Sequence, residues 1–113
     1  MKKHVVLCII PLLLLLSMLP ALGCQVQSVQ LEAHYKNGIA LIIDGEYEEA
    51  IVELNKAIEL DPEYADAYHN RGFAYDKSGE VAKAISDYEK CIELSNDPEL
   101  VEAAQLRLDA ITQ

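Results

Sequence analysis

The sequence predicts an all-α protein: a short α-solenoid of two stacked helical pairs and a closing helix, preceded by an N-terminal signal or anchor segment. Three observations support this fold class. The chain repeats itself at a fixed period, its apolar residues recur at helical spacing, and its composition changes abruptly after the first two dozen residues.

The N-terminal segment has the layout of a secretory signal. Lys2 and Lys3 precede an almost unbroken apolar run from Val5 to Leu22, and small residues stand just before Cys24. Lysines hold their end of such a segment in the cytoplasm. We therefore expect the residues after Cys24 on the far side of a membrane.

Three outcomes fit this segment. Ala21, Leu22, Gly23 and Cys24 resemble a bacterial lipobox, in which the cysteine becomes the lipid-bearing first residue of the mature protein. Ala21 and Gly23 also satisfy the small-x-small rule of an ordinary signal peptidase, which would give a secreted protein. The apolar run, of about 18 residues, is also at the lower limit for a span that stays as an uncleaved anchor.

We predict the first outcome. Residues 1–23 are then a lipoprotein-type signal peptide, Cys24 is the lipidation site, and residues 24–30 (CQVQSVQ) are a short polar tether. The expected location is the cell membrane or outer membrane, with the domain on the extracytoplasmic side. Cys91 is then the only remaining thiol, and its helical position predicts a buried core residue.

The repeat defines two helix-turn-helix units. A shift by one repeat period brings Gly38 onto Gly72 and Gly45 onto Gly79. The helices are predicted at residues 31–44 and 47–60 in the first unit, and at 65–78 and 81–94 in the second. Gly45 and Gly79 are predicted to end helices in a left-handed conformation, whereas Gly38 and Gly72 are predicted where a neighbouring helix approaches closely.

This pattern resembles the tetratricopeptide repeat (TPR), a helix-turn-helix motif with a period of about 34 residues. The resemblance rests on packing positions in both units: Gly38, Leu41, Gly45, Tyr47, Ala50, Leu54, Ala57 and Leu60-Asp61-Pro62 in the first, and Tyr68, Gly72, Tyr75, Gly79, Ala84, Tyr88 and Ile92-Glu93-Leu94 in the second. His34 and Asn37 depart from it, because the family has large apolar residues there, and Cys91 replaces the usual alanine.

Residues 95–113 are predicted to cap the two repeats of residues 31–94. Asp97 is a suitable N-cap and Pro98 a suitable first helical residue. One face of the helix is apolar (Val101, Ala104, Leu108 and Ile111). Because about three repeats are usually needed for independent stability, a homo-oligomer remains an alternative.

The charge of the chain limits its partners. All 19 acidic residues lie after residue 23, where only seven of the nine Lys and Arg remain, so the mature chain has a net charge of −12. This acidity argues against nucleic acid and against adhesion to anionic lipid, and it suits a basic partner.

No catalytic constellation stands out. His34 and His69 have no cysteine or histidine at metal-ligand spacing, His4 lies in the predicted signal peptide, and no glycine-rich phosphate loop is present in the sequence. The sequence therefore predicts a protein that is not an enzyme and has no metal and no cofactor.

The resemblance implies that the first helix of each pair lines a concave groove, which receives an extended peptide or a partner helix. The corresponding residues are Glu32, Tyr35, Ile39 and Ile42 in the first pair and Asp66, His69, Asn70, Phe73, Asp76 and Lys77 in the second. An apolar floor with an acidic rim would favour an apolar segment carrying Lys or Arg. Glu53 is expected on the opposite, convex side, where substitution should have no effect.

The predicted function is that of a non-catalytic protein–protein interaction adaptor, a membrane-anchored TPR lipoprotein on the outer side of a bacterial membrane. The alternatives are a self-associating structural unit and a TPR domain on an uncleaved N-terminal anchor. The family also includes clamps for the terminal carboxylate of chaperones. Only Asn70 stands at a matching place, so such a clamp is not supported.

Overall fold

A computed structural model describes the backbone of residues 2–113 and the side chains of residues 22–113. The described chain forms five helices and no strand: α1 (Lys2–Asp44), α2 (Tyr47–Leu60), α3 (Ala65–Lys77), α4 (Val81–Leu94) and α5 (Pro98–Thr112). The all-helical prediction is confirmed, and the helix ends predicted after residue 31 agree with the structure to within one residue.

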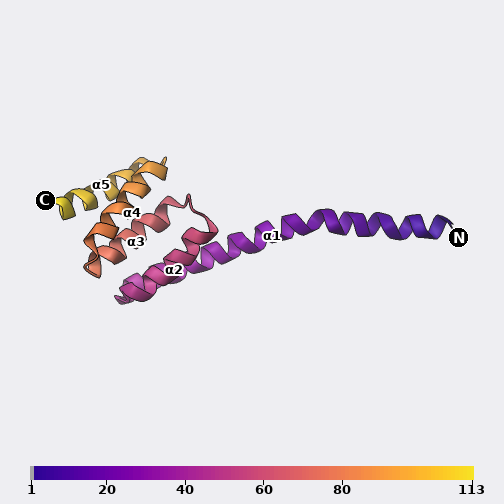
Figure 1. The fold of residues 1–113 in the computed structure, drawn as a ribbon, viewed down its shortest axis with the longest axis horizontal. Coiled ribbons are helices and arrows are strands. Elements are labelled where there is room, and N and C mark those ends of the chain that lie inside the picture. Colours follow the sequence, from indigo (N-terminus) through magenta and orange to yellow (C-terminus); the bar gives the residue numbers. More distant parts are fainter. Residues whose placement is uncertain (1) are drawn as a thin grey trace.

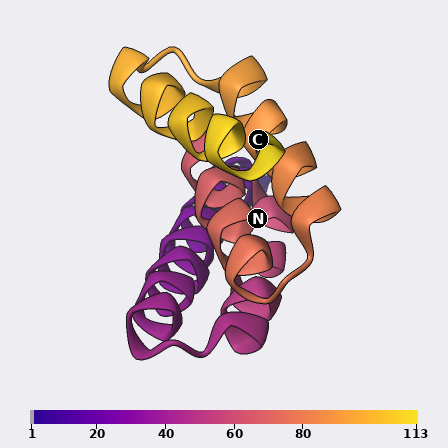
Figure 2. The same ribbon diagram turned by 90° about the vertical axis from the view of Figure 1, so that its left-hand side faces the viewer.

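The helices stack in chain order. α1 packs against α2 and α3 against α4 as two pairs, α2 joins the pairs by packing against α3, and α5 packs against α4. Figure 1 shows this succession, and Figure 2 shows α5 lying across the end of the stack. Because α1 also touches α3, the first helices of the two pairs lie on the same side of the stack.

The first helix begins well before residue 31, where the sequence predicted its start. Residues 24–30, predicted as a tether, belong to α1, and their side chains are all exposed. No proline interrupts the chain between Cys24 and Asp44, so nothing local stops the helix from extending away from the stack.

The predicted signal peptide lies almost wholly outside the residues whose side chains are described. Its lipobox is described only from Leu22 onward. Within residues 22–113, none of the helices combines the length and the apolar character that crossing a membrane requires.

In each pair, one glycine ends the first helix, as predicted. Gly45 has φ of 80° and Gly79 has φ of 84°, in the left-handed region that favours glycine. The N–H of Glu46 donates to the carbonyl of Leu41 at 2.8 Å, and the N–H of Gly45 donates to the carbonyl of Ile42 at 3.0 Å. These paired bonds form a Schellman motif, which satisfies carbonyls that the helix end would otherwise leave unpaired.

The other two glycines lie at close helix contacts. A Cβ atom built on Gly38 would stand 2.7 Å from Cγ of Leu54, and one built on Gly72 would stand 3.1 Å from Cε1 of Tyr88. Both partners are fully buried on the second helix of the same pair. The missing side chain therefore lets each pair of helices approach, which confirms the predicted role.

The buried core runs along the stack and consists mainly of small residues. Its members are Ala50, Leu54, Ala57, Ala67, Ala74, Ala84, Tyr88, Cys91 and Ala104. Cys91 is buried as predicted, and burial, with a smaller contribution from Asp66, raises the pKa of its thiol to about 11. From α5, Ala104 belongs to this core, and Leu108 and Ile111 pack against it.

Glu53 is not a neutral surface residue. Its carboxylate accepts from Nζ of Lys56 at 2.7 Å and lies 2.8 Å from Nδ1 of His34, on the facing helix α1. Glu53 therefore contributes to the contact between α1 and α2, which makes it a poor choice of neutral control. His34, which departs from the family pattern, uses its polarity in this contact.

Candidate protein-binding face

The ten residues predicted to line the groove lie on two helices that touch, α1 and α3. We call this set the α1–α3 face. Glu32 and Lys77 are exposed, while the other eight are half-buried: Tyr35, Ile39, Ile42, Asp66, His69, Asn70, Phe73 and Asp76. Since none of the ten is fully buried, each keeps some surface toward solvent.

At the α1 end of this face, Tyr35 and Asn70 join the two helices. The amide nitrogen of Asn70 donates to the hydroxyl of Tyr35 at 3.2 Å and to the carbonyl of Asp66 at 2.8 Å. The ring of Tyr35 also lies 4.9 Å from that of Tyr64, between ring centroids. Because both donor hydrogens of Asn70 have partners inside the protein, Asn70 holds the face together and is poorly placed to bind a carboxylate.

At the α5 end, Phe73 is the centre of a cluster. Nζ of Lys77 lies 5.4 Å from the ring centroid of Phe73, and Cζ of Arg107 lies 4.9 Å from it. The rings of Phe73 and Tyr47 of α2 meet in an edge-to-face arrangement, with centroids 6.3 Å apart. Phe73 thus links the face to α2 and α5 instead of standing alone on α3.

Sequence reasoning did not find Arg107, although a signal was available. Ile39, Phe73 and Arg107 follow one another at intervals of one repeat period, so the repeat register extends into the capping helix. The apolar face of this helix predicts only a capping role. In the structure α5 contributes a side chain to the face in addition to covering the core.

Within residues 22–113, Nε2 of His69 and the hydroxyl of Tyr88 are buried and have no hydrogen-bond partner. Their rings are 5.7 Å apart between centroids. Burial and the positive charge of Arg107 lower the pKa of His69 against the opposing effect of Asp66, so His69 is neutral at pH 7. Burial, chiefly, raises the pKa of Tyr88 to about 12.

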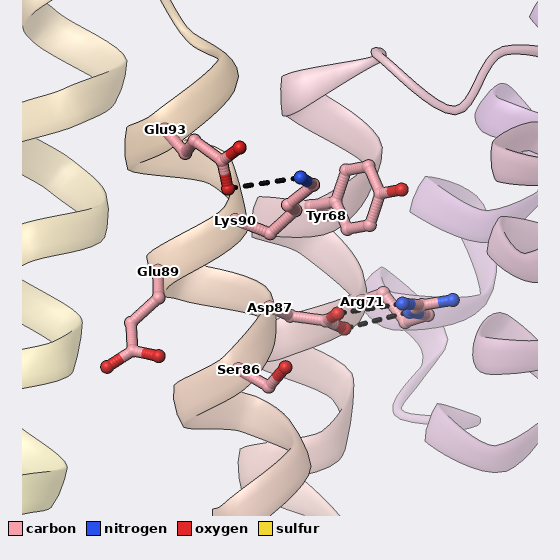
Figure 3. A pocket seen from close by; sticks show the side chains of 7 residues that line it. All are labelled: Tyr68, Arg71, Ser86, Asp87, Glu89, Lys90 and Glu93. Carbon is pink, nitrogen blue, oxygen red and sulfur yellow. Dashed lines mark hydrogen bonds and ion pairs between the residues drawn. The ribbon is translucent and has the colours of Figure 1, made fainter.

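Three hollows among residues 22–113 are lined by residues outside the α1–α3 face. One, of about 390 Å³, is lined by Tyr68, Arg71, Ser86, Asp87, Glu89, Lys90 and Glu93 of α3 and α4. In Figure 3 its charged groups pair with each other, Arg71 with Asp87 and Lys90 with Glu93. These cations are therefore neutralised locally and offer little to a ligand.

Metal binding has no support in the described part of the chain, where no group of three or more His, Cys, Asp or Glu side chains converges. His69, Asp66 and Asp76, which all lie on α3, do not form such a group. Cys24, the predicted lipidation site, is an exposed free cysteine on α1.

Comparison with known proteins agrees with the repeat. A TPR repeat family matches residues 38–79, and a tetratricopeptide repeat family matches residues 65–98. No curated protein is significantly similar in sequence to this chain.

Two solved structures are similar in fold. The crystal structure of MamA shares 32% identity with a TM-score of 0.57, over 73% of this chain and 56% of that one. The first TPR of Spaghetti (RPAP3), bound to the HSP90 peptide SRMEEVD, shares 22% identity with a TM-score of 0.50, over 76% of this chain and 93% of that one. This chain thus spans little more than half the length of MamA, and the second likeness concerns the fold alone.

The two family matches together run from Gly38 to Pro98, across both glycine-marked turns, the last turns of α1 and all of α2, α3 and α4. The chain therefore contains tetratricopeptide repeats.

Proposed function

We propose that this protein is a non-catalytic adaptor that binds a protein or peptide partner on its α1–α3 face and is held at the outer side of a bacterial membrane by a lipid on Cys24. Tetratricopeptide repeats suggest protein interaction, and the neighbour bound to an HSP90 peptide is an example. The observation that carries the proposal is the face itself, on which half-buried aromatic and apolar side chains of two helices are open to solvent.

The partner would gain most from the aromatic side chains. Aromatic residues that a partner buries supply a large share of binding energy at protein interfaces. Tyr35 and Phe73 stand at the two ends of the face, fixed by contacts within the protein. Fixed side chains lose little conformational entropy on binding, which favours affinity.

Capture of the partner from membranes tests the face. The full chain is crosslinked in cells, solubilised and recovered with its partner, and the wild type is compared with Tyr35→Ala and Phe73→Ala. Each substitution should weaken binding by roughly 1–3 kcal/mol. Val52→Ala is the matched control, because Val52 is 53% exposed on α2, away from the face. If Val52→Ala loses as much binding as the two variants, or if both variants bind fully, the partner does not bind on the α1–α3 face.

The anchoring proposal rests on the lipobox resemblance and on the geometry of α1. The side chains from Leu22 to Gln30 are exposed, and the first partly buried residue is Leu31. At a rise of 1.5 Å per residue, the helix between Cys24 and Leu31 spans about 10 Å. A lipid on Cys24 would then hold the repeats a short distance from the bilayer.

Mass spectrometry of the processed protein separates the three N-terminal outcomes. A lipid-modified Cys24 at the N-terminus supports the proposal, and Cys24→Ser should leave an unprocessed precursor. Several acyl chains bind membranes firmly, whereas one alone binds only marginally. An unmodified N-terminus near Cys24 would indicate secretion, and an intact Met1 would indicate an uncleaved anchor.

Self-association is a second candidate, favoured by one feature of α1. Leu22, Val26 and Val29 are more than half exposed and follow each other at spacings of four and three residues, as in a helix–helix seam. Light scattering over a range of concentrations tests this candidate. A mass that rises to a dimer and returns to a monomer in Val26→Glu would support it, whereas a monomer throughout would exclude it.

A further inference from the structure

Within residues 22–113, two cations of this acidic protein have no ion pair. This part of the chain contains seven Lys and Arg, and five of them pair with a carboxylate: Lys36 with Glu32, Lys56 with Glu53, Arg71 with Asp87, Lys83 with Glu80 and Lys90 with Glu93. Lys77 and Arg107 are the two left over among the described residues. With 19 acidic residues in the protein, the lack of a partner does not reflect a shortage of carboxylates.

Both unpaired cations lie over the same aromatic ring. Lys77 on α3 and Arg107 on α5 each lie within 5.4 Å of the centroid of Phe73, although they come from different helices. A cation over an aromatic ring is held there by the electron-rich face of the ring. Within the described residues, the guanidinium of Arg107 makes neither a hydrogen bond nor an ion pair, so its N–H donors are free to bind a ligand.

We propose that Phe73, Lys77 and Arg107 form a subsite for the side-chain carboxylate of a Glu or Asp in the partner segment, with apolar neighbours of that residue packing near Phe73. This inference rests on the proposed binding face and adds an acidic residue to the partner. The charge complementarity is local: Glu32 and Asp66, toward the α1 end, suit a basic residue, whereas the α5 end suits an acidic one.

The surrounding groups define how strong the subsite is. Asp76 precedes Lys77 on α3 and, within the described residues, forms no ion pair with either cation, but its negative charge opposes a bound carboxylate. His69 is neutral at pH 7, so it adds no charge of its own. Lys77 and Arg107 therefore supply the attraction, and Asp76 reduces it.

Blocked heptapeptides test the subsite directly. The probes are acetyl-Gly-Ser-Leu-X-Leu-Ser-Gly-amide, in which X is Glu, Gln or Lys, titrated into the full chain in detergent micelles at low salt. Binding is followed by NMR at the Nε–H group of Arg107. The Glu peptide should bind about fivefold more tightly than the Gln peptide, as expected for a partly exposed ion pair, and the Lys peptide should bind most weakly.

Charge variants distinguish a local subsite from a general electrostatic attraction by the whole protein. Arg107→Gln and Lys77→Gln should each bring the Glu-to-Gln preference close to one. Asp76→Asn should increase it, because it removes the opposing charge. Lys83→Gln is the matched control, since it removes one positive charge on α4, away from Phe73, and should leave the preference unchanged. A version of the Gln peptide with a free C-terminal carboxylate tests whether the subsite binds a terminal carboxylate instead of a side-chain carboxylate.

Failure of the subsite is distinguishable from failure of the adaptor function. If the Glu and Gln peptides bind equally, or if neither shifts the Arg107 signal, the subsite is wrong. The face itself is tested independently by the effect of Tyr35→Ala on partner capture, because Tyr35 lies at the other end. A preference for the Lys peptide would likewise overturn the inference.

Discussion

Arg71 on α3 and Asp87 on α4 form a bidentate ion pair inside the second helical pair. Nε of Arg71 donates to Oδ2 at 2.8 Å and Nη2 donates to Oδ1 at 2.7 Å, while Nη1 donates to Oδ1 of Asn55 on α2 at 2.8 Å. One side chain therefore connects three helices and both repeats. Asp87 is only 4% exposed, so its charge depends on this partner.

Removal of Arg71 should destabilise the protein strongly. Arg71→Ala leaves the Asp87 carboxylate buried without a counter-ion, and the free energy of unfolding should fall by about 3 kcal/mol, measured by urea denaturation. The double variant Arg71→Met with Asp87→Leu removes both charges together and should lose less than the single variant. A single variant as stable as the wild type would mean that Asp87 is solvated in solution.

Gly38 should not accept even a methyl group. The added Cβ of Gly38→Ala would approach Cγ of Leu54 to 2.7 Å, so the variant should lose about 1–2 kcal/mol despite the higher helix propensity of alanine. Leu54→Ala alone should cost about 2–4 kcal/mol through a cavity, and the double variant should cost less than the sum. Additive losses by thermal denaturation would indicate that the two residues do not touch.

Gly72 should be similarly intolerant of bulk. A leucine there must displace Tyr88 and Asp87, whose atoms lie 3.1–3.2 Å from the position of the added Cβ. Gly72→Leu should cost on the order of 1–3 kcal/mol. An equal or higher melting temperature would contradict the close contact between α3 and α4.

Stability should fall on mild acidification because of His69. Its pKa is lower in the folded chain than its ordinary value of 6.5, so the unfolded state binds the proton more readily. The contribution of His69 is complete above about pH 6.5 and is lost as the pH falls toward the folded pKa. Urea denaturation of His69→Gln should show a flatter dependence between pH 7 and pH 5; an unchanged slope would assign the effect to another group.

Glu53 should affect the stability of the protein at a lower pH than His69 does. Its hydrogen bonds to His34 and Lys56 lower its pKa from 4.5 to about 2. The stabilisation is therefore present above about pH 4.5 and is lost as the pH falls toward 2. Glu53→Gln should cost about 1 kcal/mol at neutral pH, because the contact is partly exposed to solvent. Glu59→Gln, an exposed substitution on the same helix, is the control.

The ends of some helices could be predicted from the local sequence. The left-handed turns at Gly45 and Gly79 follow from glycine at the end of an apolar helical period, and the start of α5 follows from Asp97 and Pro98, where the Asp97 carboxylate accepts from the N–H of Glu99 at 3.0 Å. The point at which α1 joins the stack could not, because no proline or glycine between Cys24 and Leu31 marks where packing begins.

The sequence by itself determined the repeat, its helices and the residues that occupy the face between α1 and α3, because each period of the repeat returns the same local pattern of apolar and small side chains. The tertiary structure alone decided which polar side chains meet. Arg71 with Asp87, His34 with Glu53, and Arg107 with Phe73 join residues of different helices. Such pairs depend on how the helices cross and on which rotamers the neighbouring side chains leave open, and a periodic pattern along one chain does not contain that information.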